Sequence, residues 1–108
     1  VDQDIYAAME DTKKLSGLTV LFNNHPNPCS TATTFEYFLP GQSNVTLELL
    51  NLNGQQIRII DSGIRESGKQ VIAWDGMDAT GKPVVEGIYF YRLSTDQKVI
   101  TKRLAVVR

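Results

Sequence analysis

The sequence is poor in the side chains from which most catalytic and metal sites are built. It has one cysteine, Cys29, and one histidine, His25, among 108 residues. A single cysteine excludes an intrachain disulfide, and His25 has no second histidine nearby with which to form a zinc site. The two residues lie four positions apart in a proline-containing segment, which is poor geometry for a nucleophile and its base. We therefore expect no enzymatic activity, and we expect Cys29 to be buried like a small apolar residue.

Charge of one sign and long apolar runs are also lacking. The 11 basic and 12 acidic residues give a net charge of −1, which offers no basic footprint for nucleic acid or an anionic membrane. No run approaches the roughly 20 apolar residues of a membrane-spanning helix. The longest apolar clusters, residues 88–91 and 104–107, have the length of strands. With 42% apolar residues, the chain fits one compact domain with a modest core.

Short β-prone segments separated by turn-forming residues occupy most of the chain. We expect strands at residues 18–22, 33–39, 45–52, 55–60, 69–74, 88–94 and 99–107. Seven short strands at this spacing predict an all-β, immunoglobulin-like antiparallel sandwich over residues 18–108. Residues 1–17 are more polar, and we expect them to form a linker or a short helical lead-in from an upstream domain.

The clearest local signal is the dipeptide Asn53-Gly54. It predicts a hairpin with a two-residue type I′ turn, in which both central residues have positive φ. In the returning strand, simple alternation places Ile57 and Ile59 on one face. Residues 61–68 are expected to form a loop.

The glycine-rich connection at residues 75–83 contains two carboxylates, Asp75 and Asp78. A calcium site is conceivable there, but a calcium loop supplies more oxygen ligands and ends in a bidentate glutamate. Asp and Gly also form tight turns without an ion, and we favour that interpretation. Trp74, just before this connection, is expected in the core.

Three motifs in a fixed order carry a resemblance to a known family. They are Asn24 to Ser30 ahead of Thr33-Thr34-Phe35; Val45-Thr46-Leu47 through Asn53-Gly54-Gln55-Gln56-Ile57; and Trp74-Asp75-Gly76 with Gly81-Lys82-Pro83-Val84 and Gly87-Ile88-Tyr89-Phe90-Tyr91, closing on residues 98–108. This set resembles the C-terminal sorting domain of the type IX (Por) secretion system of Bacteroidetes-group bacteria. It is also similar to the immunoglobulin-like domain of the flagellar hook-capping protein. The family usually has a large aromatic residue where this chain has Cys29, a difference expected to alter local packing only.

The resemblance implies delivery without catalysis and without a cofactor. Such a domain directs an N-terminal cargo domain through the type IX translocon, by way of the periplasm, to the outer-membrane surface or the medium. A sortase-type peptidase would then often remove it. In the family the signal is concentrated near the end of the chain. The residues this implies for recognition are Gly87, Tyr89, Lys98, Lys102 and Arg103.

Each of these residues also has a structural interpretation. Gly87 fits a strand entrance that needs room or a positive φ. Tyr89 and Tyr91 share a strand face, so their rings are candidates for the core. Lys98 and Lys102 fall on one side of a regular strand. Basic residues there would protect an exposed edge strand from stray pairing, or would meet the translocon by strand addition or by charge.

Two other functions remain open. The domain would serve equally well as a structural or assembly module, as in hook capping, or as a spacer in a surface protein. A sorting signal needs a free C-terminus, so a parent protein continuing past Arg108 would favour the structural or assembly function instead. A carbohydrate-binding module is the other alternative, and it would need exposed, coplanar aromatic side chains.

Overall fold

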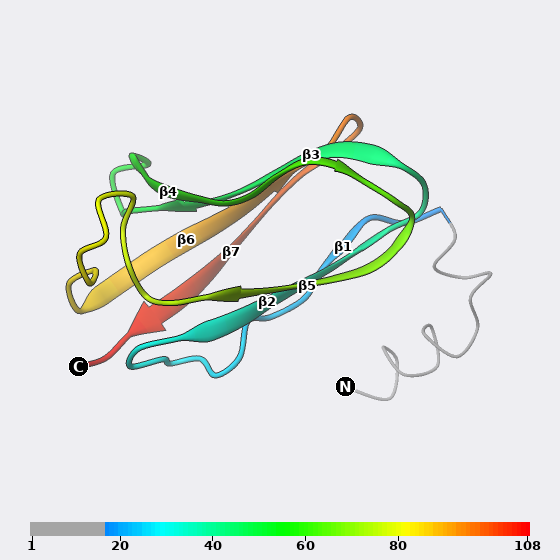
Figure 1. Ribbon diagram of the computed structural model, residues 1–108. Helices are drawn as coiled ribbons and strands as arrows, with labels where there is room; N and C mark the ends of the chain where they lie inside the picture. The colour runs from blue at the N-terminus through cyan, green and yellow to red at the C-terminus, as the bar shows by residue number, and fades with distance from the viewer. Residues whose placement is uncertain (1–16) are drawn as a thin grey trace.

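Two antiparallel β-sheets face each other in the computed structural model, which describes residues 17–108 (Figure 1). The strands are β1 (Val20–Leu21), β2 (Thr33–Leu39), β3 (Ser43–Leu50), β4 (Gln56–Arg65), β5 (Gly68–Trp74), β6 (Gly87–Ser94) and β7 (Val99–Val106). One sheet has the order β1-β2-β5 and the other β4-β3-β6-β7. The predicted seven-stranded sandwich is confirmed. The expected lead-in at residues 1–17 lies outside the described residues, apart from Gly17.

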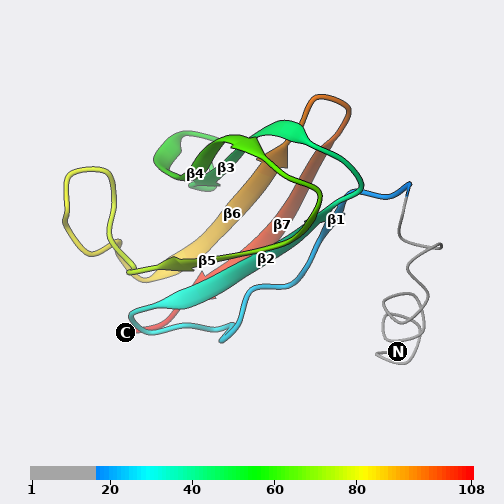
Figure 2. The same cartoon turned by 45° about the vertical axis from the view of Figure 1, so that its right-hand side comes forward.

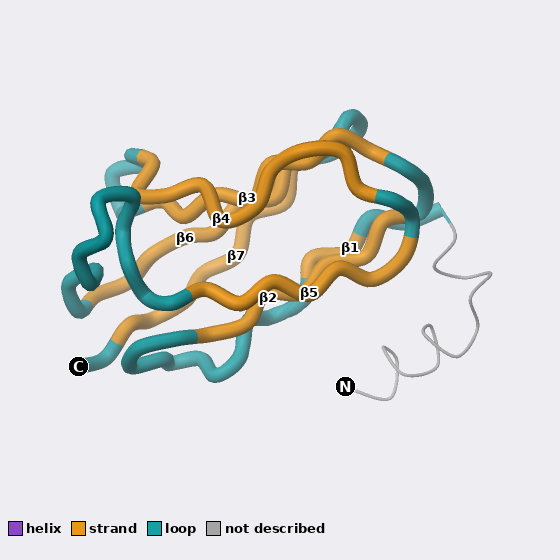
Figure 3. Tube along the Cα trace, in the orientation of Figure 1, coloured by secondary structure: helices purple, strands orange, loops and turns teal. Residues whose placement is uncertain are grey.

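The described part of the chain consists of strands and loops (Figure 3). Within residues 17–108, no helix has the length and apolar character needed to cross a bilayer.

The core is built from alternating side chains of the facing strands. In β2, β3 and β6 the inward residues are Phe35, Tyr37, Leu39, Val45, Leu47, Leu49, Tyr89, Tyr91 and Leu93, all buried. The ring of Phe35 packs against Tyr91 with centroids 4.8 Å apart, and against Trp74 at 6.2 Å. Burying a large apolar side chain contributes roughly 1.5–3 kcal/mol, so this cluster holds the two sheets together. The expected core positions of Trp74 and the tyrosine pair are confirmed.

The hairpin between β3 and β4 exists, but its predicted type I′ turn is wrong. Gly54 has a φ of 81°, whereas Asn53 has no positive φ. The Gly54 N–H donates to the Asn51 carbonyl at 2.9 Å, and the Asn51 N–H donates to the Gln55 carbonyl at 3.0 Å. This is a three-residue loop, a type I turn followed by a left-handed glycine. The Asn51 side-chain oxygen also accepts from the backbone N–H groups of Asn53 and Gln55, which stabilises this turn instead.

The prediction of a loop at residues 61–68 is also wrong. β4 continues to Arg65, and β5 begins at Gly68. The polar residues that indicated a loop lie on the strand, where Asp61 accepts a hydrogen bond from the buried Tyr37 hydroxyl at 2.9 Å and pairs with Arg65. A buried tyrosine hydroxyl needs a hydrogen-bond partner, and this need accounts for a carboxylate on β4 at this position.

Two bulges in β4 change which of its side chains face the core. The register against β3 skips Ile57 and Ile60, so each is an extra residue on the bulged strand. Both pack against the core, whereas Ile59 is 48% exposed. The expectation that Ile57 and Ile59 share a face is therefore wrong, because a bulge breaks the period of two on which it depended.

The proline-rich segment at residues 23–32 crosses from one sheet to the other along one side of the sandwich (Figure 2). It follows β1, which pairs with β2, and it reaches β7 at Cys29. Tyr91 fixes its start, since the hydroxyl donates to the Phe22 carbonyl and accepts from the Asn24 N–H, both at 3.0 Å. The segment therefore ties the two sheets together at the flank where β7 lies.

Candidate functional site

The five residues implied in recognition all belong to the hairpin formed by β6 and β7. Gly87 and Tyr89 lie on β6, whereas Lys102 and Arg103 lie on β7. Lys98 stands one residue before β7, in the connecting turn. The structure thus brings all five onto one hairpin, although their side chains do not form a single cluster.

Gly87 and Tyr89 contribute to the architecture of this hairpin. Gly87 has a φ of 156°, and a Cβ there would meet nothing within 4 Å, so backbone conformation rather than space favours glycine. Tyr89 is 6% exposed, and its hydroxyl donates to the Val85 carbonyl at 2.6 Å. Burial raises the pKa of this phenol above its ordinary value.

β7 is an edge strand of its sheet, and its two basic residues point to opposite faces. Lys102 is paired with Tyr91 in the register, so it belongs to the inward-facing row even though it carries a charge. Lys102 is half-buried, whereas Arg103, one residue further, is exposed on the outer face. Lys98 is exposed and lies outside the strand.

The cations at this edge differ from those on the other strands, although Lys82, in the loop at residues 75–83, likewise has no carboxylate within ion-pair distance among residues 17–108. On β4, β5 and β6, the basic residues Arg58, Arg65, Lys69 and Arg92 each pair with a carboxylate. Within residues 17–108, no carboxylate lies within ion-pair distance of Lys98, Lys102 or Arg103. Three cations that no carboxylate of the described residues neutralises therefore lie on or directly before β7.

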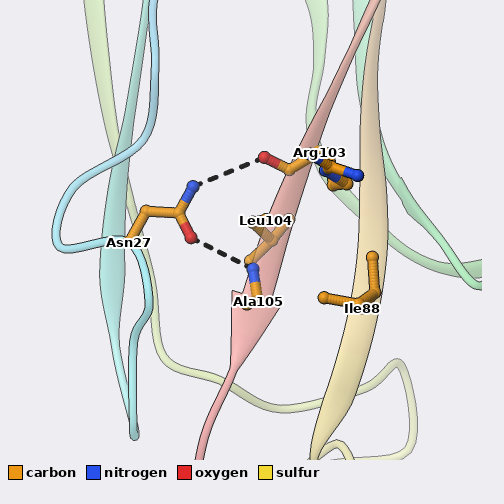
Figure 4. A pocket seen from close by; sticks show the side chains of 5 residues that line it. All are labelled: Asn27, Ile88, Arg103, Leu104 and Ala105. Carbon is orange, nitrogen blue, oxygen red and sulfur yellow. Dashed lines mark hydrogen bonds between the residues drawn. The ribbon is translucent and has the colours of Figure 1, made fainter.

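The second half of the β7 edge is covered by the crossing segment (Figure 4). The side-chain amide of Asn27 forms two hydrogen bonds with β7. Its nitrogen donates to the Arg103 carbonyl at 3.4 Å, and its oxygen accepts from the Ala105 N–H at 3.1 Å. Next, the Cys29 N–H donates to the Ala105 carbonyl at 3.0 Å, and the Val107 N–H donates to the Cys29 carbonyl at 2.9 Å. This segment acts as a short neighbouring strand.

The first half of the same edge is open. Ala105 directs its N–H and C=O away from β6, so in an antiparallel ladder the same groups of Val99 and Thr101 also point outward, as does the Arg103 N–H. Within residues 17–108, β7 has no second strand as a neighbour there. Val99 is 63% exposed, and Thr101 is exposed as well. About five residues of strand edge are thus available for pairing.

A shallow depression of about 440 Å³ lies where the covered part begins, lined by Asn27, Ile88, Arg103, Leu104 and Ala105. Figure 4 shows Asn27 reaching from the loop to β7 on one side of that strand, with Ile88 on the other side. Sequence reasoning did not select Asn27 or Thr101 for this site. The only sequence signal for Asn27 is its position between two prolines, and nothing local indicates its partner 78 residues away.

Cys29 and His25 do not form a reactive pair. Cys29 is 2% exposed, as predicted, and burial raises the pKa of its thiol, which keeps it protonated. His25 is exposed, and its backbone pairs with Thr34. Within residues 17–108, no three His, Cys, Asp or Glu side chains are grouped so that they would hold a metal ion.

Asp75 and Asp78 are engaged in turns. Asp75 accepts from the Met77 N–H at 3.0 Å and from Arg58 at 2.6 Å. Asp78 accepts from the Thr80 hydroxyl at 2.6 Å, from the Thr80 N–H and from the Lys82 N–H. These hydrogen bonds lower the pKa of both carboxyl groups, with the Met77 N–H dominant for Asp75 and the Thr80 hydroxyl for Asp78. The turn interpretation accounts for the positions of both side chains.

The aromatic residues do not form an exposed platform. Among residues 17–108, every Phe, Tyr and Trp is buried or half-buried, the half-buried ones being Phe22, Phe38 and Phe90. The coplanar exposed aromatics expected of a carbohydrate-binding module are thus missing from this part of the chain.

Solved structures with the same fold include two proteins from Porphyromonas gingivalis and one from Pseudomonas aeruginosa. Latent dimeric PorU from Porphyromonas gingivalis superposes with a TM-score of 0.64 and 21% identity over 83% of this chain. PorZ from the same bacterium superposes with a TM-score of 0.57 and 20% identity over 82% of this chain. FlgD from Pseudomonas aeruginosa superposes with a TM-score of 0.55 and 22% identity, also over 82% of this chain. The matched part is 9% of PorU, 11% of PorZ and 72% of the FlgD chain. At these identities the likeness shows the fold alone, which is the predicted immunoglobulin-like sandwich.

The family comparison gives a more specific result. No curated protein matches the sequence. The family model described as the FlgD Ig-like domain matches residues 29–98, which is more than half of the chain. The match runs from Cys29, within the crossing segment, to Lys98, the residue before β7. The chain therefore belongs to the family of FlgD immunoglobulin-like domains.

Proposed function

We propose that the chain is a non-catalytic C-terminal sorting domain that directs an N-terminal cargo domain through the type IX translocon. The observation that carries the proposal is the fold shared with PorU and PorZ. PorZ is described as an essential bacterial surface component of the type-IX secretion system. The two superpositions cover more than four fifths of this chain, but only 9% of the PorU chain and 11% of the PorZ chain. This supports a small module attached to a larger exported protein.

In this function the β6–β7 hairpin is the recognition element. Lys98, Lys102 and Arg103 contact the translocon, because they are cations without a carboxylate partner in the described structure. Gly87 and Tyr89 shape β6, which holds β7 in position. The partners are the translocon, the cargo in cis and a sortase-type peptidase that removes the domain. The destination is the outer-membrane surface or the medium.

The test is the export of a reporter. A periplasmic enzyme is fused ahead of residues 18–108 and expressed in a host with a type IX system and in the same host lacking the translocon. We expect the reporter at the surface or in the medium of the first host only. Retention in the periplasm of the competent host, where a known sorting domain exports the same reporter, would overturn the proposal.

A structural or assembly module is the second candidate, and the family itself favours it. The matching model is the FlgD Ig-like domain, and the fold covers 72% of the Pseudomonas FlgD chain. A folded domain attached after Arg108 separates the two functions. A sorting signal loses export when its C-terminus is blocked, whereas an internal module stays functional in a chain that continues.

A further inference from the structure

We propose that the open half of β7 is a docking site for an extended acidic segment of the translocon, which adds to the sheet as a further strand beside Val99–Arg103. The inference rests on the proposed function and deepens it, since it names the kind of partner and its position. It goes beyond a charge attraction because the backbone itself supplies most of the contact.

The backbone of β7 sets where the partner lies. The outward N–H and C=O groups of Val99 and Thr101, with the N–H of Arg103, form a row that another strand can pair with. At about 3.4 Å per residue, this row admits roughly five residues of partner strand. It ends at Asn27, whose side chain already occupies the Arg103 carbonyl and the Ala105 N–H. The crossing segment therefore fixes the end of the added strand and thereby its register.

The charges set the chemistry of the partner. Lys102 is on the inward-facing row and Arg103 on the outer face, so a strand beside them meets a cation on both of its faces. Successive residues of a strand point to opposite faces. Two adjacent acidic residues on the partner would thus reach Lys102 and Arg103 together, while Lys98 lies at the far end of the row. Such charge complementarity chiefly gives specificity and a faster association.

The same charges disfavour a second copy of this chain as the occupant. Two β7 strands pairing edge to edge would bring Lys102 and Arg103 of one copy close to the cations of the other. Like charges directly opposite in a sheet are destabilising. A partner of opposite charge does not meet this barrier.

The binding test uses the 108-residue chain and a capped eight-residue peptide, Thr-Val-Thr-Glu-Glu-Val-Thr-Val. Amide exchange is followed by NMR. The peptide should slow exchange at the N–H groups of Thr101 and Arg103 by about tenfold or more. The matched peptide with Lys-Lys in place of Glu-Glu should give no protection. Equal protection by both peptides, or protection confined to residues outside β7, would overturn the inference.

Two variants of one residue separate strand addition from simple charge attraction. Thr101→Pro removes an outward N–H that the pairing of β7 with β6 does not use, so the sheet keeps its ladder. Thr101→Val keeps that N–H. The Pro variant should lose peptide protection at Arg103, and the Val variant should retain it, with circular dichroism confirming that both are folded. Protection that survives in a folded Pro variant would overturn strand addition.

The same variants in the reporter fusion distinguish the inference from the function. If the unmodified fusion is exported and the Thr101→Pro fusion is retained, both stand. Export of both, with the Pro variant folded, overturns the docking site and leaves the sorting function. Retention of both overturns the sorting function and, with it, the translocon as the occupant of the docking site.

Discussion

Lys102 is paired with Tyr91 across β6 and β7, so a charged side chain and a fully buried aromatic occupy the same face of the sheet. A lysine among core-facing residues is unusual on a central strand, but β7 is an edge. An inward-pointing charge is one of the ways in which natural proteins keep edge strands from pairing indiscriminately. In this chain the charge filters partners: it opposes an apolar or basic strand and accepts an acidic one.

Lys102→Leu should remove this filter. The substitution continues the inward row formed by Ile100 and Leu104, and it should raise the free energy of unfolding by about 1 kcal/mol through added apolar burial. Self-association should rise at the same time, measured by analytical ultracentrifugation. Thr101→Leu is the matched control, because Thr101 points outward and gains no burial. Unchanged self-association in Lys102→Leu would count against a protective role for the charge.

Asn27→Ala should lengthen the open edge. It removes two hydrogen bonds to β7 at an exposed site, where water replaces them, so the loss of stability should be only about 1 kcal/mol. The decisive measurement is amide exchange at Ala105, which should become faster because its acceptor is gone. The Leu104 N–H provides an internal control, since it faces β6 and should exchange as before. Equal acceleration at both amides would indicate general loosening of β7 instead.

Tyr91→Phe should be far more costly than its small change in volume suggests. The hydroxyl satisfies both the Phe22 carbonyl and the Asn24 N–H, and it lies in the interior. Leaving buried polar groups unpaired costs about 1–3 kcal/mol, which urea denaturation would detect. Tyr89→Phe serves for comparison. Its partner carbonyl belongs to Val85, which is 75% exposed, so water can replace the lost bond and stability should change little.

Stability should fall in acid because of the turn at residues 75–83. In the folded chain the pKa values of Asp75 and Asp78 lie below the ordinary value of about 3.9 that holds in the unfolded chain. Below about pH 5 the unfolded chain binds more protons, so the contribution is complete above this range and is lost as pH falls through the folded pKa values. Urea midpoints measured from pH 7 to pH 3 test this. Asp78→Asn keeps an acceptor oxygen without a titratable group, and it should flatten the curve in part.

Much of the sandwich is visible in the sequence because inward and outward residues alternate. The expected limits of β2, β5, β6 and β7 agree with the structure to within one residue at each end. β4 is where the sequence fails. Its bulges at Ile57 and Ile60 shift the alternation, and Asp61 is polar because it serves the Tyr37 hydroxyl rather than because it lies in a loop. Such partners are distant along the chain, and no local pattern reports them.

The candidate site was predictable only in part for the same reason. The basic residues near the end of the chain are evident, and so is the possibility of an edge strand. What the sequence hides is that the crossing segment, in which Asn27 lies 78 positions before Ala105, covers half of that edge and leaves the other half open. The division of β7 into a covered and an open part is a property of the tertiary fold.

The sorting function is tested most directly by the export of a reporter fused to the N-terminus of this chain in a type IX-competent host. The fraction outside the periplasm should be high for the unmodified chain. It should fall to the level of a translocon-deficient host for a folded variant with Lys98→Glu, Lys102→Glu and Arg103→Glu together. Retention of the unmodified fusion in the periplasm, where a known sorting domain exports the same reporter, would contradict the account.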